Sequence, residues 1–334
     1  MTIKAYHWKL FKLVAALALL TFIGKRFYHD LRQVSLDELS PAPGWLLLSA
    51  ILYLVGLGSS WLFWQRLLQR FGERPTIRCT MRAYFVGHLG KYVPGKAWAM
   101  LLRGSLAREG GVNIGVAIVT AFYEVLTTMA SAALLAAAIF CFQPPDVPES
   151  PDLPWSPVLI GLFLLVVVSV PLWPGVFNLL LRRLAGRFAS VAALKLPQVR
   201  LATLAEGLFI TNCGWLLMGV SLWATLRGMV PSLPALTPSV WLHCLAALGL
   251  AYVAGFLAIV LPGGVGVREF LLLYLLRPLV SPGSESLIAV AVLVLRLLWT
   301  AAELVTAAAV YCLPVTSVER ANQLRNWAAS EKKP

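Results

Sequence analysis

Residues 83–95 read AYFVGHLGKYVPG, and residues 251–263 read AYVAGFLAIVLPG. The two stretches share six of thirteen columns without a gap, and both end in Pro-Gly. In a chain rich in Leu and Ala, about one match is expected at a random offset, so the similarity indicates an internal repeat. A Pro-Gly pair removes a backbone donor and then a side chain. We therefore expect one broken helix in each half of the chain.

The composition around these stretches is that of a membrane protein. Of the 334 residues, 59% are hydrophobic and 13% are charged, whereas about 25% of the residues of a soluble domain are charged. This excludes an ordinary cytosolic enzyme, a disulfide-rich secreted fold and a disordered chain. The five cysteines form no CxxC pair, so we expect buried, reduced thiols and no metal site.

Apolar runs long enough to cross a bilayer need about 20 residues. Such runs cover 45–68, 112–142, 157–176, 203–226 and 286–313, with a shorter first run over 8–24. Two further apolar regions, 79–107 and 240–277, contain the Pro-Gly breaks. We expect an all-α polytopic fold in a single membrane domain over 1–334. It has about six full spans and two re-entrant or broken-helix hairpins, which makes eight or more helices.

The distribution of positive charge predicts the orientation. If both termini are cytoplasmic and both broken regions re-enter, 21 of the 28 Lys and Arg residues lie inside, as the positive-inside rule requires. The segment 177–202 is then a basic cytoplasmic loop, and 314–334 is a cytoplasmic tail. The segment 143–156 has no Lys or Arg and is external. The cations are spread over short loops, which argues against nucleic acid as a partner.

The repeat has a predicted topology. Repeat one covers 45–142 with its break at 94–95, and repeat two covers 203–313 with its break at 262–266. The spans that precede the two breaks are three crossings apart, so the copies face opposite ways. Inverted repeats with broken helices are typical of transporters. The alternative is that the repeats only build a stable bundle and that the breaks at Pro94 and Pro262 serve packing.

Cations and glycines surround both breaks. A half-helix that starts after a break presents free N–H groups, which favour an anion such as phosphate. The cationic candidates for phosphate binding are Lys91, Lys96, Arg103 and Arg268, and the glycines that permit close backbone approach are Gly95, Gly263, Gly264 and Gly266. For Lys91 and Lys96 the alternative is that both ammonium groups only reach the cytoplasmic interface.

Charges within apolar helices are the second group of candidates. Glu124 and Arg296 lie in mid-span, Glu303 follows Arg296 by seven residues, and Glu269 follows Arg268. Intramembrane charges are normally paired, so we expect a Glu124–Arg296 or an Arg296–Glu303 ion pair. The pair is either static or part of a gate, a substrate path or a proton relay. Three weaker candidates are expected to be interhelical hydrogen-bond partners: Glu206, Asn212 and His243.

Motifs of enzymes and cofactors are incomplete. Residues 90–96 resemble part of a phosphate-binding loop, but Ala97 replaces the required Ser or Thr. The block GGVGVRE lacks the third glycine of a dinucleotide fingerprint, and the four histidines are scattered. We therefore expect no cofactor, no metal and no enzymatic activity.

The motifs also carry a resemblance. GHLGKYVPGKAW at 87–98, LPGGVGVRE at 261–269 and the helices of Glu124 and Arg296 resemble the transmembrane region of lysylphosphatidylglycerol synthases. This is a flippase-like family of integral membrane proteins, and the likeness covers about residues 10–313. The resemblance implies a multi-span fold with re-entrant elements and a role in moving lipids between leaflets. Because no soluble synthase domain is evident, we do not expect aminoacyl transfer.

The leading hypothesis is a flippase-like protein of the cell membrane. It would translocate an anionic phospholipid or a polyprenyl-phosphate-linked sugar, and its partners would be membrane lipids. The alternatives are a non-transporting partner of a lipid or envelope glycosyltransferase, and an ion-coupled transporter of a small anion. Substrate, direction of transport and oligomeric state stay open at this point.

Overall fold

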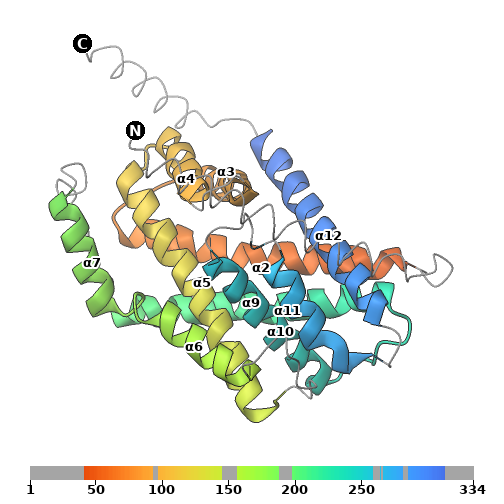
Figure 1. Ribbon diagram of the computed structural model, residues 1–334. Helices are drawn as coiled ribbons and strands as arrows, with labels where there is room; N and C mark the ends of the chain where they lie inside the picture. Colours follow the sequence, from red (N-terminus) through yellow and green to blue (C-terminus); the bar gives the residue numbers. More distant parts are fainter. Residues whose placement is uncertain are drawn as a thin grey trace, which may run out of the picture. The chain divides into compact units, whose positions relative to one another are not determined.

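The structure is a computed structural model that describes residues 41–92, 97–144, 156–187, 198–258, 264, 266–280 and 285–312. Within these ranges every regular element is a helix (Figure 1). The protein is therefore an all-α polytopic membrane protein, as the composition predicts. The expected first run over 8–24 and the tail over 314–334 lie outside the described residues.

Five described helices are long and apolar enough to cross a membrane. They are α2 (Pro43–Arg70), α5 (Ile114–Phe142), α9 (Leu201–Met229), α10 (Pro238–Leu257) and α12 (Glu285–Tyr311). Four of them begin and end within about three residues of a predicted span. At 1.5 Å per residue even the 20 residues of α10 reach about 30 Å, the thickness of the hydrocarbon core.

The second predicted hairpin has unequal arms. α10 ends at Leu257 and α11 (Val267–Leu276) begins ten residues later, so the interruption of 240–277 includes the predicted break at 262–266. The arm before the interruption has 20 residues and the arm after it has ten. The first hairpin has short arms, α3 (Ile77–His88) and α4 (Ala97–Glu109), joined in part by the 3₁₀ turn η2 (Leu89–Tyr92).

The predicted span over 157–176 is divided. α6 (Pro157–Ser169) and α7 (Pro174–Arg187) are separated by a short break and bent by 50°, and the pair counts as one further candidate span. Pro171 and Pro174 explain the break, since proline cannot continue a helical hydrogen-bond ladder. The expected basic loop over 177–202 therefore begins as helix.

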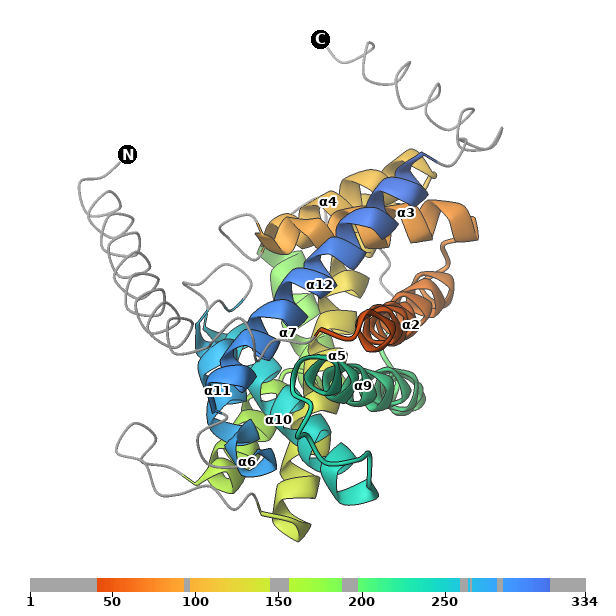
Figure 2. The same cartoon turned by 90° about the vertical axis from the view of Figure 1, so that its right-hand side faces the viewer.

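The chain forms two compact units. The first comprises the described parts of Met1–Tyr53, Ala132–Leu164 and Leu216–Trp299, and the second comprises those of Leu54–Ser131, Leu165–Trp215 and Thr300–Pro334. Each unit contains one hairpin: α10 and α11 pack together in the first, and α3 and α4 pack together in the second (Figure 2).

Small residues bring the helices close in both units. In the second unit a Cβ added to Gly214 on α9 would lie 2.0 Å from Ser59 Oγ on α2. In the first unit a Cβ added to Gly249 on α10 would lie 2.8 Å from the carbonyl oxygen of Ala132 on α5. Such contacts are typical of membrane helices, whose association depends on close packing and not on hydrophobic burial.

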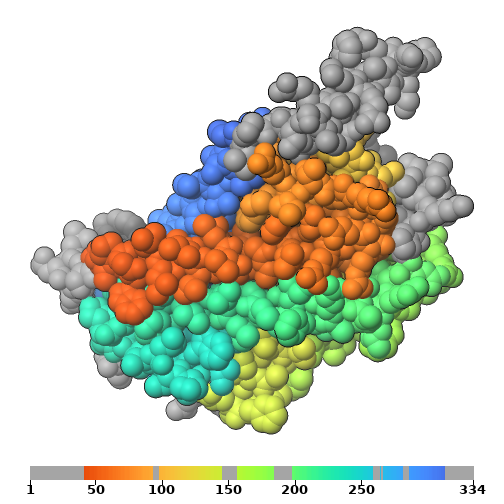
Figure 3. All heavy atoms as spheres, turned by 180° about the vertical axis from the view of Figure 1, so that it is seen from behind, coloured from red at the N-terminus to blue at the C-terminus, as the bar shows by residue number. Residues whose placement is uncertain are grey.

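Apolar side chains cover the outer surface of the long helices. α2, orange-red in Figure 3, exposes large apolar side chains along its length, among them Leu47, Ile51 and Val55. On α12 Val305 is also exposed. Contiguous apolar surface of this kind marks an interaction site on a soluble protein, but it is the normal lipid-facing surface of a membrane helix.

Candidate functional site

The second hairpin turns through glycines. Gly264 and Gly266 have φ values of +68° and +92°, which lie in the left-handed region that favours glycine. A Cβ added to Gly264 would lie 2.8 Å from the Cα of Gly255 on α10. The close approach that Gly264 permits is thus to the backbone of the other arm. Pro262 and Gly263 lie outside the described residues.

Arg268, the second residue of α11, lies on an aromatic platform in the first unit. Its guanidinium carbon is 3.5 Å from the ring centre of Tyr252 and 5.2 Å from that of Trp299. Trp299 stacks on Tyr53 with ring centres 4.1 Å apart, and its Nε1 donates a hydrogen bond to Ser221 Oγ. Trp299 is therefore held in place by Tyr53 and Ser221, and the guanidinium of Arg268 lies against a fixed ring.

No carboxylate among the described residues pairs with Arg268. The side chain is half-buried, and the platform occupies the face of the guanidinium, whereas its N–H groups lie at the edge. A half-buried cation without a described counter-ion is a candidate for anion binding. Arginine binds phosphate through such a planar edge with two parallel hydrogen bonds.

The neighbouring residue Glu269 has a different role. Its Oε1 contacts Arg296 Nη1, and its Oε2 accepts a 2.5 Å hydrogen bond from the Gly266 N–H. Arg296 therefore pairs with Glu269, and the expected pairing of Arg296 with Glu124 or Glu303 is wrong. The start of α11 directs Glu269 toward α12, and sequence spacing does not show which helices face each other.

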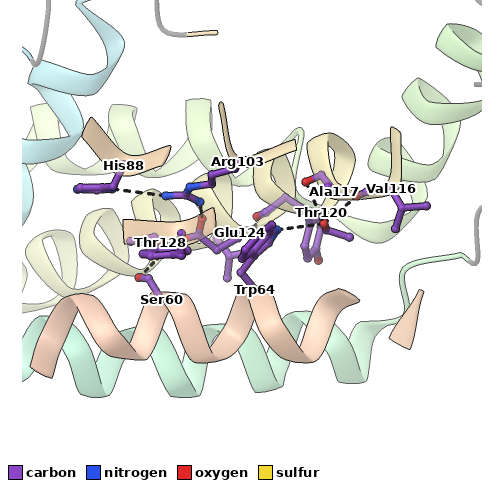
Figure 4. A network of polar contacts seen from close by, with 12 residues as sticks. Ser60, Trp64, His88, Arg103, Val116, Ala117, Thr120, Glu124 and Thr128 are labelled. Carbon is purple, nitrogen blue, oxygen red and sulfur yellow. Dashed lines mark hydrogen bonds and ion pairs between the residues drawn. The ribbon is translucent and has the colours of Figure 1, made fainter. Parts of the chain in front are cut away.

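A buried ion pair joins α4 of the first hairpin to α5 (Figure 4). Arg103 on α4 and Glu124 on α5 are 3% and 2% exposed, and Arg103 Nη1 donates a 2.6 Å hydrogen bond to Glu124 Oε2. Glu124 Oε1 accepts hydrogen bonds from the hydroxyls of Tyr84 and Thr128, each at 3.2 Å. The carboxylate thus has three donors, and the charge of Arg103 is compensated.

The two hairpins share a side-chain arrangement. In the first, the guanidinium carbon of Arg103 lies 3.9 Å from the ring centre of Tyr84. In the second, Arg268 lies over Tyr252, which occupies the same column of the repeat as Tyr84. Each hairpin therefore fixes one arginine on a tyrosine, but a described carboxylate neutralises only Arg103.

A second polar cluster lies between the turn of the first hairpin and α12. Lys91 Nζ lies 2.5 Å from Glu303 Oε1, and the Tyr92 hydroxyl donates a 2.9 Å hydrogen bond to Glu303 Oε2. His88 Nε2 lies 2.9 Å from Lys91 Nζ. Burial, and then the Lys91 ammonium, lower the pKa of His88 to about 4, so that this histidine is neutral at pH 7.

Two of these side chains are not among the sequence candidates. They are His88 and Tyr92, for which the sequence predicts no binding role. The signal that points to them is their position beside Lys91 in GHLGKY, within about two helical turns before the break. Lys96 and Gly95, the other candidates at this break, lie outside the described residues together with Pro94.

The weaker candidates have mostly structural partners. His243 on α10 bonds to the Leu275 carbonyl oxygen on α11 at 2.5 Å, which confirms an interhelical hydrogen bond. Glu206 on α9 pairs with Arg66 and Arg70 of α2. The Oδ1 of Asn212 is buried and has no partner among the residues that the structure describes.

Comparison with models of protein families gives a match. Residues 9–313 match the family model described as the lysylphosphatidylglycerol synthase TM region. A search of the curated proteins finds no match. The matched range contains both hairpins, together with Arg268 and its aromatic platform, the Arg103–Glu124 pair and the cluster around Glu303.

Proposed function

The chain belongs to the lysylphosphatidylglycerol synthase transmembrane-region family, and on that premise we propose that it moves an anionic lipid between the leaflets of the cell membrane. The cargo is a phospholipid or a polyprenyl-phosphate-linked sugar, and the protein makes no covalent change to it. In this proposal the two repeats have inverted topology and both termini are cytoplasmic.

The arrangement of Arg268 is the observation that supports the proposal best. The guanidinium is fixed on Tyr252 and Trp299, and no described carboxylate neutralises it. It follows a glycine turn at the start of α11, where N–H groups without helical partners add positive potential. In this proposal Arg268 binds the phosphate of the headgroup as the lipid passes the hairpin.

The charges of the first unit favour an anionic headgroup. Glu269 is the one acidic residue whose side chain the structure describes in this unit, and it is bound to Arg296 and to the Gly266 N–H. A lysine-modified headgroup would bring an ammonium group that needs a free carboxylate. A phosphate without such an ammonium group fits Arg268 better, since no described carboxylate neutralises this arginine.

The experiment is lipid transfer in vesicles that contain the purified full chain. Fluorescent phosphatidylglycerol, phosphatidylcholine and a polyprenyl-phosphate sugar are tested in turn, and a membrane-impermeant quencher reports which leaflet holds the dye. We expect faster exchange than in empty vesicles for at least one anionic lipid. No transfer above empty vesicles for any of these lipids would contradict the proposal.

Three variants connect the transfer rate to the site. Arg268→Ala removes the cation, and we expect it to lower the rate about tenfold or more. Arg268→Lys keeps the charge but loses the planar edge, so an intermediate rate is expected. The matched control is Arg200→Ala, which removes an exposed arginine before α9 and leaves the hairpins unchanged. Equal rates for Arg268→Ala and Arg200→Ala would exclude this role of Arg268.

A further inference from the structure

Within the second unit, three side chains of the first hairpin converge on the carboxylate of Glu303 on α12. Lys91 Nζ lies 2.5 Å from Glu303 Oε1, His88 Nε2 lies 3.6 Å from the same oxygen, and the Tyr92 hydroxyl donates to Glu303 Oε2 at 2.9 Å. Tyr92 also exchanges a 2.9 Å hydrogen bond with Thr300, one turn earlier on α12. The two oxygens of Glu303 thus have separate donors.

This set of donors suits a phosphate as well as a carboxylate. An ammonium group and a phenol hydroxyl both donate to anionic oxygens, and such charge-assisted hydrogen bonds are stronger than neutral ones. His88 Nε2 lies 2.9 Å from Lys91 Nζ and positions the ammonium group. The chemistry of the set therefore does not depend on Glu303 as the bound anion.

Burial differs between the donors and the carboxylate. Glu303 is 2% exposed, whereas the side chain of Lys91 is 28% exposed and Tyr92 lies at the surface. A ligand that approaches the hairpin therefore meets Lys91 and Tyr92 before it meets Glu303. Both donors are reachable without unfolding of α12.

The described charges of the cluster are paired when Glu303 occupies it. Lys91 pairs with Glu303, Arg103 pairs with Glu124, and neutral His88 lies between the pairs with its Nδ1 3.4 Å from Arg103 Nη2. Among the described side chains of this set, a phosphate that joined with Glu303 in place would put two anions beside one ammonium group, that of Lys91. Phosphate and Glu303 are therefore alternative occupants.

We propose that Lys91 and Tyr92, positioned by His88, form a second phosphate-binding site and that Glu303 is its internal occupant, which a lipid phosphate displaces. The inference rests on the proposed function and adds a step to it. A headgroup that enters the first hairpin frees α12 from η2, and the departure of the headgroup restores the Lys91–Glu303 contact. Glu303 thus prevents the empty site from retaining other anions.

Binding measurements on the purified full chain test this inference separately from transport. All variants carry Arg268→Ala, so that the site of the second hairpin does not contribute. The probes are dihexanoylphosphatidylglycerol, inorganic phosphate and, as a phosphate-free control, dihexanoylglycerol. In this background Glu303→Gln is expected to raise the affinity for the phospholipid at least about tenfold, which corresponds to about 1.4 kcal/mol.

Further variants show whether the gain comes from this site. Lys91→Met added to Glu303→Gln is expected to abolish the gain, and Glu303→Asp, which shortens the side chain but keeps the charge, is expected to give a smaller gain than Glu303→Gln. Glu303→Asp also serves as the test if Glu303→Gln does not fold. A gain for phospholipid but not for inorganic phosphate identifies a lipid headgroup as the ligand, and an equal gain identifies free phosphate.

Several results would overturn the inference. The first is an affinity for the phospholipid that is unchanged or weaker in Glu303→Gln. The second is a gain in this affinity that persists when Lys91→Met is added. The third is an equal gain in affinity for dihexanoylglycerol. Transfer of lipid in vesicles together with any of these results would leave the proposed function intact and reject the role of Glu303. A higher phospholipid affinity in Glu303→Gln, without lipid transfer in vesicles by the wild-type protein, would reject transport but support the binding site of Lys91 and Tyr92.

Discussion

The buried pair of Arg103 and Glu124 gives the sharpest prediction for stability. Glu124→Gln keeps the size of the side chain and its contacts with the hydroxyls of Tyr84 and Thr128, but it removes the charge that faces Arg103. Arg103 is 3% exposed. Breaking a buried pair on one side costs about 3–5 kcal/mol because it leaves a buried charge without a partner.

A matched control exists in the same unit. Glu206 is likewise paired with arginine, in this case with Arg66 and Arg70. Unlike Arg103, Arg66 has a side chain that is 49% exposed. Water can therefore solvate this arginine when Glu206→Gln removes the counter-charge, and an exposed pair contributes about 0–1 kcal/mol. The two substitutions remove the same chemical group and differ in burial.

The assay is thermal unfolding in one detergent, followed by loss of the monodisperse size-exclusion peak. With about 2–4 °C per kcal/mol, Glu124→Gln is expected to lower Tm by about 10 °C, and Glu206→Gln by no more than about 4 °C. The double variant Arg103→Met with Glu124→Leu removes both charges and is expected to recover at least half of the loss. Equal shifts for the two Glu→Gln variants, or no recovery in the double variant, would refute this reasoning.

Three further predictions concern the two hairpins. Gly264→Ala is expected to lower stability by about 1–3 kcal/mol because φ is +68° and the added Cβ meets Gly255 at 2.8 Å; Gly58→Ala, with nothing within 4 Å, is the control in the same thermal assay. In the folded protein the pKa of His88 is about 4, below the ordinary value of 6.5. As the pH drops, the unfolded chain therefore binds a proton at His88 before the folded chain does. The free energy of unfolding is expected to fall between about pH 6.5 and about pH 4, by at most roughly 3 kcal/mol. His88→Gln is expected to flatten this part of the curve of Tm against pH, and an unchanged curve would show that other groups cause it. Tyr252→Leu is expected to lower lipid transfer several-fold by removing the ring under Arg268, whereas Tyr252→Phe keeps the ring and is expected to retain transfer; equal loss in both would exclude the stacking role.

The membrane helices could be predicted closely because bilayer thickness sets their length. The apolar runs that become α2, α5, α9 and α12 each exceed 20 residues and end near charges or prolines. The region around α6 and α7 was less predictable. Its apolar run predicts one span, but Pro171 and Pro174 divide it, and the basic residues that follow continue a helix.

The pairing of charges could not be predicted from spacing. Arg296 and Glu303 are seven residues apart on one helix, which places them near the same face, yet Arg296 contacts Glu269 and Glu303 contacts Lys91. These partners depend on how the short arm of each hairpin lies against α12 within its own unit. Sequence periodicity shows which residues share a face of one helix. Which side chains of other helices contact that face depends on how the helices pack. The cations beside the breaks were predictable as a group, but the sequence did not show that Arg268 is the one without a described carboxylate partner.

The most direct test of the central claim is the initial rate of fluorescent phosphatidylglycerol transfer in vesicles of wild-type protein and of Arg268→Ala. The protein is expected to exchange this lipid faster than empty vesicles do, and Arg268→Ala is expected to lose about tenfold or more of that rate while it keeps the wild-type Tm. Equal rates in wild type and Arg268→Ala, at equal amounts of folded protein, would contradict the role assigned to Arg268.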